Sequence, residues 1–268
     1  MKEKVSNVTV ILPVYKLDDK TKQLIVNSIK SVEEQIVKPD ELLLIVGKDD
    51  KESLEFVKSI DFGSIKDNVR IIENDGETDF ASQFNLGVKE AKTEWVSLLE
   101  QDDEISKVWF KNFIEYKNAY PNIDIFLPII VDVNNTGEFI GFSNEAVWAN
   151  SFSDVLGVLD NQALNAYQNF NIDGMVIKKE RYETFGGIKK NIKLTFVYEF
   201  LLRMTLKDVK VMVIPKFGYK HINQREGSLF HTYSQTMNPV EARWWLDKAK
   251  KEQYFPKDRE ITYDSQLA

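Results

Sequence analysis

Cysteine is absent from this chain of 268 residues, and histidine occurs only twice, as His221 and His231. Without cysteine the chain can form no disulfide bond, use no catalytic thiolate and bind no cysteine-ligated zinc. A cysteine-free sequence fits a reducing compartment, so we expect a cytoplasmic protein.

The sequence also lacks a long hydrophobic run and an excess of positive charge. No apolar stretch approaches the roughly 18 residues that a membrane helix needs, so we expect no membrane span. The amino-terminal apolar run 8–14 resembles a secretion signal, but it is short, contains Pro13 and is followed by charged residues instead of a cleavage site. A net charge of -7 argues against a general nucleic-acid binder, although it leaves room for a local basic groove.

Apolar segments alternate with amphipathic segments through the first 120 residues. Segment 8–14 is a continuous β-branched run, which is typical of a strand buried on both faces. The same reasoning predicts strands at 41–46, 69–73 and 94–99, and helices at 19–35, 51–60, 79–92 and 105–120. Strands and helices that alternate at this spacing predict βαβ units and a parallel sheet.

The second half of the chain is less regular. Strands are expected at 122–133, 139–142, 171–179 and 209–215, and helices at 181–187 and 194–207. Residues 143–170 are expected to form loops and short helices. Because neither a repeat nor a linker is present, we predict one domain over 1–230 and a carboxyl-terminal extension over 231–268.

An acidic segment directly follows the predicted strand 94–99. Residues 100–104 read EQDDE, which places four carboxylates in five positions. Such charges repel one another unless water or a cation lies among them. Ligands of open parallel sheets bind beyond the carboxyl ends of the strands, where this segment lies. Two interpretations remain, a solvated acidic turn or a cation site.

The order of several short motifs resembles glycosyltransferase family 2, which has the GT-A fold. The motifs are VTVILPVYK, KPDELLLIV, NLGVKEAKTEWVSLLEQDDEI, TFGGIKK, YEFLLRM and YKHINQREGS. The resemblance implies an α/β, Rossmann-like domain with a mostly parallel central sheet flanked by helices and a helical carboxyl-terminal extension. It also implies a nucleotide-sugar half at 1–104 and an acceptor half at 105–230.

The resemblance implies that the acidic segment holds Mn²⁺ or Mg²⁺ against the diphosphate of the donor. That diphosphate leaves poorly until its developing charge is neutralised. Asp102 best matches the family's ligand, Glu100 stands where the motif usually begins with Asp, and His221 is expected to complete the site. The alternatives are the solvated turn and an ordinary surface histidine. His231 matches no position of the family and is expected to be structural.

A nucleotide-sugar, first of all a UDP-sugar, is the donor that the resemblance implies. Residues expected to contact it are Pro13, Val14, Tyr15, Asn85 and Gln101, with Asp103, Arg225 and Ser228 toward the sugar and phosphates. The ring of Tyr15 can pack on a nucleobase, or it can be a core aromatic; Asn85 and Gln101 can instead cap loops. The family commonly has Asp-Asp-Gly-Ser after the second strand, and this chain reads VGKDD. Asp49 would therefore recognise the base only if this loop shifts.

The resemblance further implies an inverting transfer with a carboxylate base. The family supplies this base as Glu-Asp at the start of a helix, but the matching positions here are Phe196 and Val197. Glu199 lies about one turn further along the helix and is the expected base, unless it pairs with Arg203 at i,i+4. Asp173 is the lesser candidate.

Two functions from different classes remain open. The first is a metal-dependent glycosyltransferase that acts on a hydroxyl of a glycan, a lipid-linked saccharide, a protein or a modified DNA base, although the acidic balance disfavours DNA. The second is an inert relative that binds a nucleotide-sugar or a partner, as the missing Glu-Asp pair suggests. A sugar-phosphate nucleotidyltransferase is third, because no glycine-rich basic loop follows the first strand. Trp244 and Trp245 are expected to face the acceptor, a second copy of the chain, or the core.

Overall fold

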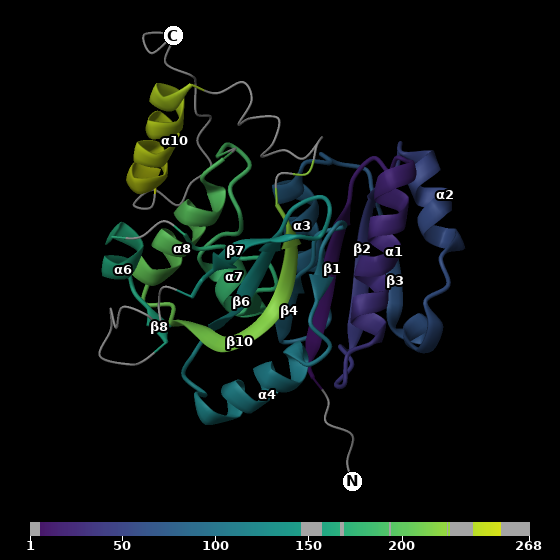
Figure 1. Ribbon diagram of the computed structural model, residues 1–268, viewed down its shortest axis with the longest axis horizontal. Helices are drawn as coiled ribbons and strands as arrows, with labels where there is room; N and C mark the ends of the chain where they lie inside the picture. The colour runs from purple at the N-terminus through teal and green to yellow at the C-terminus, as the bar shows by residue number, and fades with distance from the viewer. Residues whose placement is uncertain are drawn as a thin grey trace.

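The computed structural model describes residues 6–145, 157–166, 169–192, 194–223, 225 and 238–252. Within these residues, one sheet runs in the order β3-β2-β1-β4-β9-β6-β10-β5, with β7 paired to β6 and β8 paired to β10 (Figure 1). Helices α1, α2 and α4 pack on one face of this sheet. Helices α3, α6, α7 and α8 pack on the other face. The α/β architecture predicted from the sequence is confirmed.

The first half of the chain forms the parallel part of the sheet. Its strands are β1 (Val8–Val14), β2 (Glu41–Gly47), β3 (Val69–Asn74) and β4 (Trp95–Leu98). Its helices are α1 (Asp19–Glu33), α2 (Lys51–Ser59), the 3-10 helix η1 (Gly63–Asn68) and α3 (Phe80–Glu90). Asp18, Asp50 and Asp79 cap the amino termini of the three α-helices, where an aspartate oxygen satisfies free backbone N–H groups.

The second half mixes parallel and antiparallel strands. Its strands are β5 (Glu104–Ile105), β6 (Ile125–Val133), β7 (Phe139–Ser143), β8 (Val158–Leu159), β9 (Val176–Lys178) and β10 (Val211–Ile222). Its helices are α4 (Trp109–Ala119), α6 (Asn161–Ala166), α7 (Lys179–Thr184), α8 (Phe196–Leu206) and α10 (Pro239–Glu252). β9 lies antiparallel between β4 and β6, whereas β6 and β10 are parallel.

Two predicted boundaries were wrong for identifiable reasons. The last strand does not end at Pro215; β10 continues to Ile222, with register shifts on either side of Phe217. Proline has no N–H to donate, which interrupts a ladder without ending the strand. The strand predicted at 171–179 is only three residues long, because the chain turns at Gly174 with a φ of 70°.

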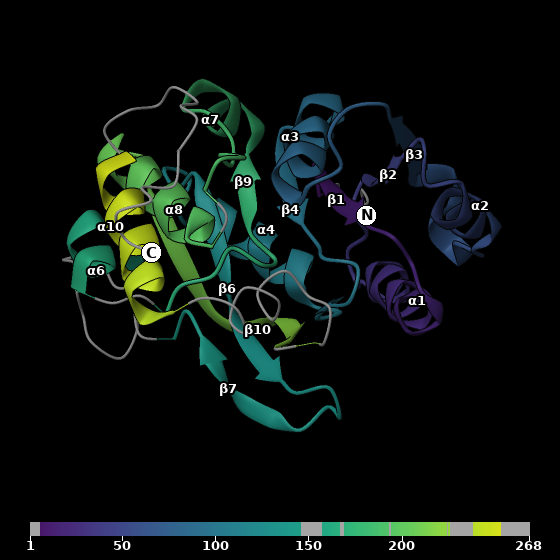
Figure 2. The same ribbon diagram turned by 90° about the horizontal axis from the view of Figure 1, so that it is seen from above.

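The helix α10 packs against α8 (Figure 2). Trp245 is buried, and its carbonyl accepts a hydrogen bond from Thr195 Oγ1 at 3.0 Å. Trp245 is therefore a core residue, the third of the roles expected for the tryptophan pair. The domain boundary at 230 stays a prediction, because it falls outside the described residues. Within the part of the chain that the structure describes, no helix is long and apolar enough to cross a membrane.

Candidate functional site

Two carboxylates and one imidazole converge beyond the carboxyl end of β4. Ligand atoms of Asp103, Asp173 and His221 all lie within 4.8 Å of one another. Asp103 and Asp173 are 1% and 3% exposed. Among the described residues, this is the group of side chains that can hold a metal ion. The group contains His221, which was expected as a metal ligand. It also contains Asp103, which was expected to contact the donor, and Asp173, which was the lesser candidate for the base.

Strand pairing explains why these three residues meet. Gly174 N–H donates to the carbonyl of Leu98 at 3.2 Å, which places Asp173 beside the end of β4. Tyr219 of β10 pairs with Ile105 of β5, which brings the following residues of β10 to the acidic segment. His221 therefore lies on β10, beyond the residue 215 at which this strand was predicted to end.

Asp103 has one satisfied and one unsatisfied carboxylate oxygen. Its Oδ1 accepts a hydrogen bond from Ile222 N–H at 2.9 Å, while its buried Oδ2 has no hydrogen-bond partner among the described residues. The carbonyl of Asp103 accepts from Ser28 Oγ at 2.6 Å, which anchors the acidic segment to α1. A buried unpaired carboxylate oxygen is costly, so this atom calls for a proton or a cation.

The electrostatics of the group show an excess of negative charge. Burial raises the pKa of Asp103 to about 8; Asp102 and Asp173 add to the rise, while His221 opposes it. Burial also raises the pKa of Glu100 well above its ordinary value, with Asp173 and Asp103 contributing. The pKa of His221 rises to about 11. Burial alone would lower this pKa, but the hydrogen bond to Asp132 and the nearby carboxylates outweigh burial. Carboxylate oxygens with one imidazole suit a divalent cation, which would neutralise this charge.

The two acidic residues expected as metal ligands have other surroundings. Asp102 Oδ2 accepts a hydrogen bond from Arg225 Nε at 2.5 Å. Glu100 is half-buried, and its N–H donates to Tyr219 Oη at 3.0 Å. Arg225, expected at the phosphates, thus lies at the same cluster. Ser228 and His231 lie outside the described residues.

The peptide bond between Val14 and Tyr15 is held by two glutamine side chains. Gln83 Nε2 donates to the carbonyl of Val14 at 3.0 Å, and Tyr15 N–H donates to Gln101 Oε1 at 2.8 Å. Pro13 and Val14 are buried in β1, so Tyr15 is the part of the expected lip that reaches the surface. Tyr15 Oη is buried without a hydrogen-bond partner among the described residues. Burial, then Glu100, Asp79 and Asp102, raises the pKa of this hydroxyl, so it remains a hydrogen-bond donor.

Two further residues expected near the donor are placed differently from each other. Asn85 binds the backbone of Ile188 through both ends of its amide, with its Nδ2 2.9 Å from the carbonyl and its Oδ1 3.1 Å from the N–H. It also accepts from Tyr182 Oη, so it holds the loop after α7. Asp49 is exposed after β2, whereas the neighbouring Asp50 caps α2.

Glu199, the expected base, lies in a different buried cluster. It is fully buried, and its carboxylate accepts from Arg203 Nε at 2.8 Å and Nη2 at 3.0 Å. Lys189 Nζ lies 3.1 Å from it. Arg203 also donates to the carbonyls of Phe185, Gly186 and Gly187. The i,i+4 pair that was the alternative for Glu199 is therefore present, in the core instead of on the surface.

The residues at the family's usual base positions are apolar. The ring of Phe196 packs against Phe80 of α3, with ring centroids 5.3 Å apart. Val197 joins the same hydrophobic cluster. Neither can accept a proton, as the sequence indicated.

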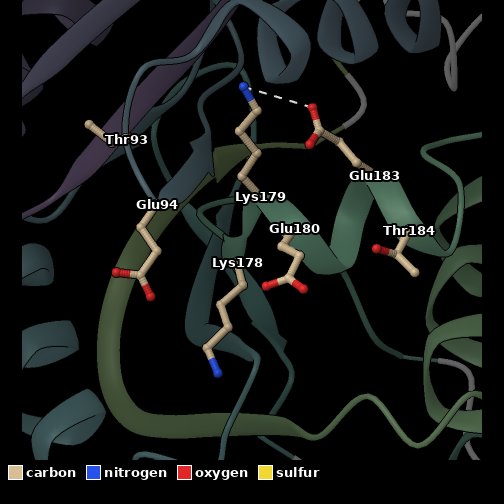
Figure 3. A pocket seen from close by; sticks show the side chains of 7 residues that line it. All are labelled: Thr93, Glu94, Lys178, Lys179, Glu180, Glu183 and Thr184. Atoms are coloured by element: carbon tan, nitrogen blue, oxygen red, sulfur yellow. Dashed lines mark ion pairs between the residues drawn. The ribbon is translucent and has the colours of Figure 1, made fainter.

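A separate surface cavity lies at the opposite, amino-terminal end of β4 (Figure 3). Its volume is about 310 Å³, and it is lined by Thr93, Glu94, Lys178, Lys179, Glu180, Glu183 and Thr184. Its lysines already have acidic partners, since Lys178 lies 2.9 Å from Asp124 and Lys179 lies 3.8 Å from Glu183. We assign this cavity no part in the site.

Comparisons with known proteins agree with the motifs in the sequence. The sequence model of the family described as "Glycosyl transferase family 2" matches residues 9–179. None of the curated proteins compared with the chain matches it. TarS 1-349 from S. aureus in complex with UDP-GlcNAc is similar in structure, with a TM-score of 0.63, 14% identity and coverage of 94% of this chain and 68% of that one. The complex of TarS 1-349 with UDP matches with a TM-score of 0.63 and 14% identity, and the match covers 94% of this chain and 67% of that one.

A longer structure of S. aureus TarS shows the extent of this likeness. It matches with a TM-score of 0.62 and 14% identity, and covers 94% of this chain but only 40% of that one. At such low identity the likeness shows the fold alone. It confirms the predicted mixed α/β fold with a mostly parallel sheet.

Proposed function

This chain belongs to glycosyl transferase family 2, and from this premise we propose that it moves a sugar from a nucleotide-sugar to a hydroxyl group with the help of a divalent cation. The observation that carries the cation is the group of Asp103, Asp173 and His221, in which two buried carboxylates share one imidazole. An inverting course is proposed on the resemblance to the family.

Asp103, Asp173 and His221 would hold the cation, Mn²⁺ or Mg²⁺. When bound, it would neutralise the charge that develops on the departing nucleotide diphosphate. The unpartnered Oδ2 of Asp103 supports this assignment. Asp102 and Glu100 contribute negative charge to the same cluster and are proposed to support the site from its edge.

Arg225 is proposed to bind a phosphate of the donor. It pairs with Asp102, and its planar fork matches the geometry of phosphate oxygens. Tyr15, held by Gln83 and Gln101, is proposed to form the lip for the nucleobase, with its buried hydroxyl as a hydrogen-bond donor.

A UDP-sugar is the proposed donor. Two of the similar TarS structures are complexes with UDP and with UDP-GlcNAc, which supports this choice for a chain of the same fold. Asp49 is exposed after β2 and stays a proposed contact to the base. We propose a hydroxyl group as the acceptor. Association with a second copy of the chain stays a prediction.

The geometry changes the proposed roles of the two carboxylates expected as bases. Asp173 has its ligand atom in the cation group, so we propose it as a cation ligand. Both carboxylate oxygens of Glu199 are engaged by Arg203 and Lys189, so neither is free to face an acceptor hydroxyl. We propose that Glu199 stabilises α8 and the loop that Arg203 binds.

The test is release of free nucleotide from UDP-, GDP-, TDP- and CMP-sugars, each with Mn²⁺, Mg²⁺ or EDTA. We expect turnover of one donor with a divalent cation, none with EDTA, and loss of turnover in Asp103→Asn. Turnover that continues in EDTA would contradict the cation.

The missing carboxylates at positions 196 and 197 favour a second candidate function, an inert relative that binds a nucleotide-sugar. The same panel separates the two functions once binding is measured beside it. Cation-dependent binding of a nucleotide, with no transfer to any hydroxyl acceptor and no hydrolysis, would support the inert relative.

A further inference from the structure

The ribbon of β6 and β7 reaches the acidic cluster without supplying any of its proposed ligands. Figure 2 shows this ribbon extending from the body of the sheet beside the end of β10. Asp132 of β6 lies directly across from His221 in the parallel ladder between β6 and β10. Sequence reasoning missed Asp132, because only the pairing of these strands brings it to His221.

Both carboxylate oxygens of Asp132 are engaged. Oδ1 lies 2.8 Å from His221 Nδ1, and Oδ2 accepts a hydrogen bond from Ser143 Oγ at 2.8 Å. Asp132 is only 7% exposed, so water competes little for these contacts. The carboxylate is therefore fixed by its neighbour on β7 and aimed at one nitrogen of the imidazole.

This contact decides which nitrogen of His221 can bind a cation. A carboxylate only accepts hydrogen bonds, so Nδ1 must carry the proton, and the lone pair of a neutral imidazole is then on Nε2. Carboxylates that hold the second nitrogen of a ligating histidine fix its tautomer and orientation and make it a better ligand.

We propose that Asp132 is a positioning residue of the cation site, which holds His221 with Nδ1 protonated and Nε2 available to the metal. This inference rests on the proposed function, because it gives a partner to one ligand of the site proposed there. Asp132 itself contacts neither substrate nor cation.

The same ribbon orients a second ligand of the site. Asn144 directly follows β7, is fully buried and has a φ of 72°, a conformation in which Asn is enriched. Its side chain binds the N–H of Asn171 at 2.9 Å and the carbonyl at 3.0 Å. The Asn171 amide in turn donates to Asp173 Oδ2. His221 and Asp173 are thus both positioned from one pair of strands.

The test measures Mn²⁺ affinity by calorimetry on the full chain without nucleotide. Asp132→Ala should weaken binding by about 10- to 100-fold. Asp132→Asn should weaken it less, because the amide oxygen still accepts from Nδ1. Gly141→Ala is the matched control on the same ribbon: Gly141 lies opposite Asp132, and a Cβ there meets nothing within 4 Å. Asp124→Asn, a buried carboxylate paired with Lys178, controls for loss of a charged core residue.

A spectroscopic signature separates positioning from a general loss of structure. With only two histidines, the ¹⁵N spectrum of the Mg²⁺-loaded protein can be assigned with the variant His231→Gln. In the wild type, His221 should show a protonated Nδ1 and a metal-bound Nε2, and Asp132→Ala should give mixed tautomers.

Three results would overturn the inference, and only the third would also overturn the proposed cation site. Unchanged Mn²⁺ affinity in Asp132→Ala, with weakened binding in His221→Ala, would remove Asp132 from the site and leave the proposed cation intact. Coordination through Nδ1 would do the same. If the wild type binds neither Mn²⁺ nor Mg²⁺, the proposed cation site fails together with the inference.

Discussion

Two of the buried carboxylate groups among the described residues differ in how their charge is neutralised. Glu199 is fully buried and faces two cations, Arg203 and Lys189. Asp103 and Asp173 are almost as deeply buried and share His221 with further carboxylates nearby. One oxygen of Asp103 has no partner among the described residues.

This difference distinguishes a buried charge that holds the fold from one that is available to a ligand. In the first group every carboxylate oxygen meets a cationic partner, so nothing is left for a ligand to do. In the second group burial and neighbouring carboxylates raise the pKa values of Glu100, Asp103 and Asp173. A bound cation would offset the cost of keeping these groups charged. Burial alone therefore does not distinguish the two groups; the balance of charge around the carboxylates does.

Removing the carboxylate of the balanced group should have the largest effect. Glu199→Ala removes the carboxylate that the buried Arg203 binds, and breaking such a buried pair costs about 3–5 kcal/mol. Urea unfolding followed by circular dichroism should show this loss. Glu183→Ala is the control, because the exposed pair of Glu183 with Lys179 should change stability by less than about 1 kcal/mol. Unchanged stability with transfer abolished would return Glu199 to the base role.

Removing a carboxylate of the unbalanced group should abolish function instead of stability. We expect Asp173→Asn to lower turnover by roughly 100- to 1000-fold, since charge stabilisation by a metal is worth several kcal/mol. Its Mn²⁺ affinity should fall at the same time. The informative contrary result is retained Mn²⁺ affinity with transfer lost, because Asp173 would then be the base and not a ligand.

The metal-free protein should respond to the two groups with opposite signs. Asp103→Asn removes a buried carboxylate that lacks a partner for one oxygen, so the free energy of unfolding in EDTA should rise by about 1–2 kcal/mol. Thermal unfolding in EDTA measures this change. The free energy of unfolding of Glu199→Gln, measured in the same way, should fall. A loss of stability in Asp103→Asn would show that this carboxylate also supports the fold.

The smallest effect is expected at the edge of the unbalanced group. Arg225→Ala should raise the KM for the donor by about tenfold, which is 1.4 kcal/mol. Mn²⁺ affinity should not fall, because the variant removes a positive charge beside Asp102 and leaves the three proposed ligands in place. Arg243→Ala on α10, whose pair with Asp247 is exposed, should leave both quantities unchanged. Equal effects of the two variants would argue against a phosphate contact.

The first half of the fold could be predicted from the sequence because its signals are local. The apolar run of β1 and the helical spacing in α1 and α3 depend on residues close together in the chain. The family motifs gave His221 and the acidic segment. The continuation of β10 past Pro215 could not be predicted, because it depends on pairing with β5 and β6.

The composition of the candidate site depended on strand order, which the sequence does not show. Asp173 reaches Asp103 only because β9 lies antiparallel beside β4. Glu199 was expected to be a base because it lies about one turn beyond positions 196 and 197, and its i,i+4 spacing to Arg203 places the two in an ion pair. The spacing predicted the pair of Glu199 and Arg203 correctly. It could not show that a second cation, Lys189, also contacts the Glu199 carboxylate.

The measurement that tests the central claim most directly is thermal unfolding of the wild type and of Asp103→Asn, with and without Mn²⁺ and UDP. Binding to the folded state at 100 times the dissociation constant stabilises by about 2.7 kcal/mol. We predict a shift of this size for the wild type, its loss in EDTA and no shift for Asp103→Asn. Identical unfolding of the wild type with and without Mn²⁺, with UDP present, would contradict the account.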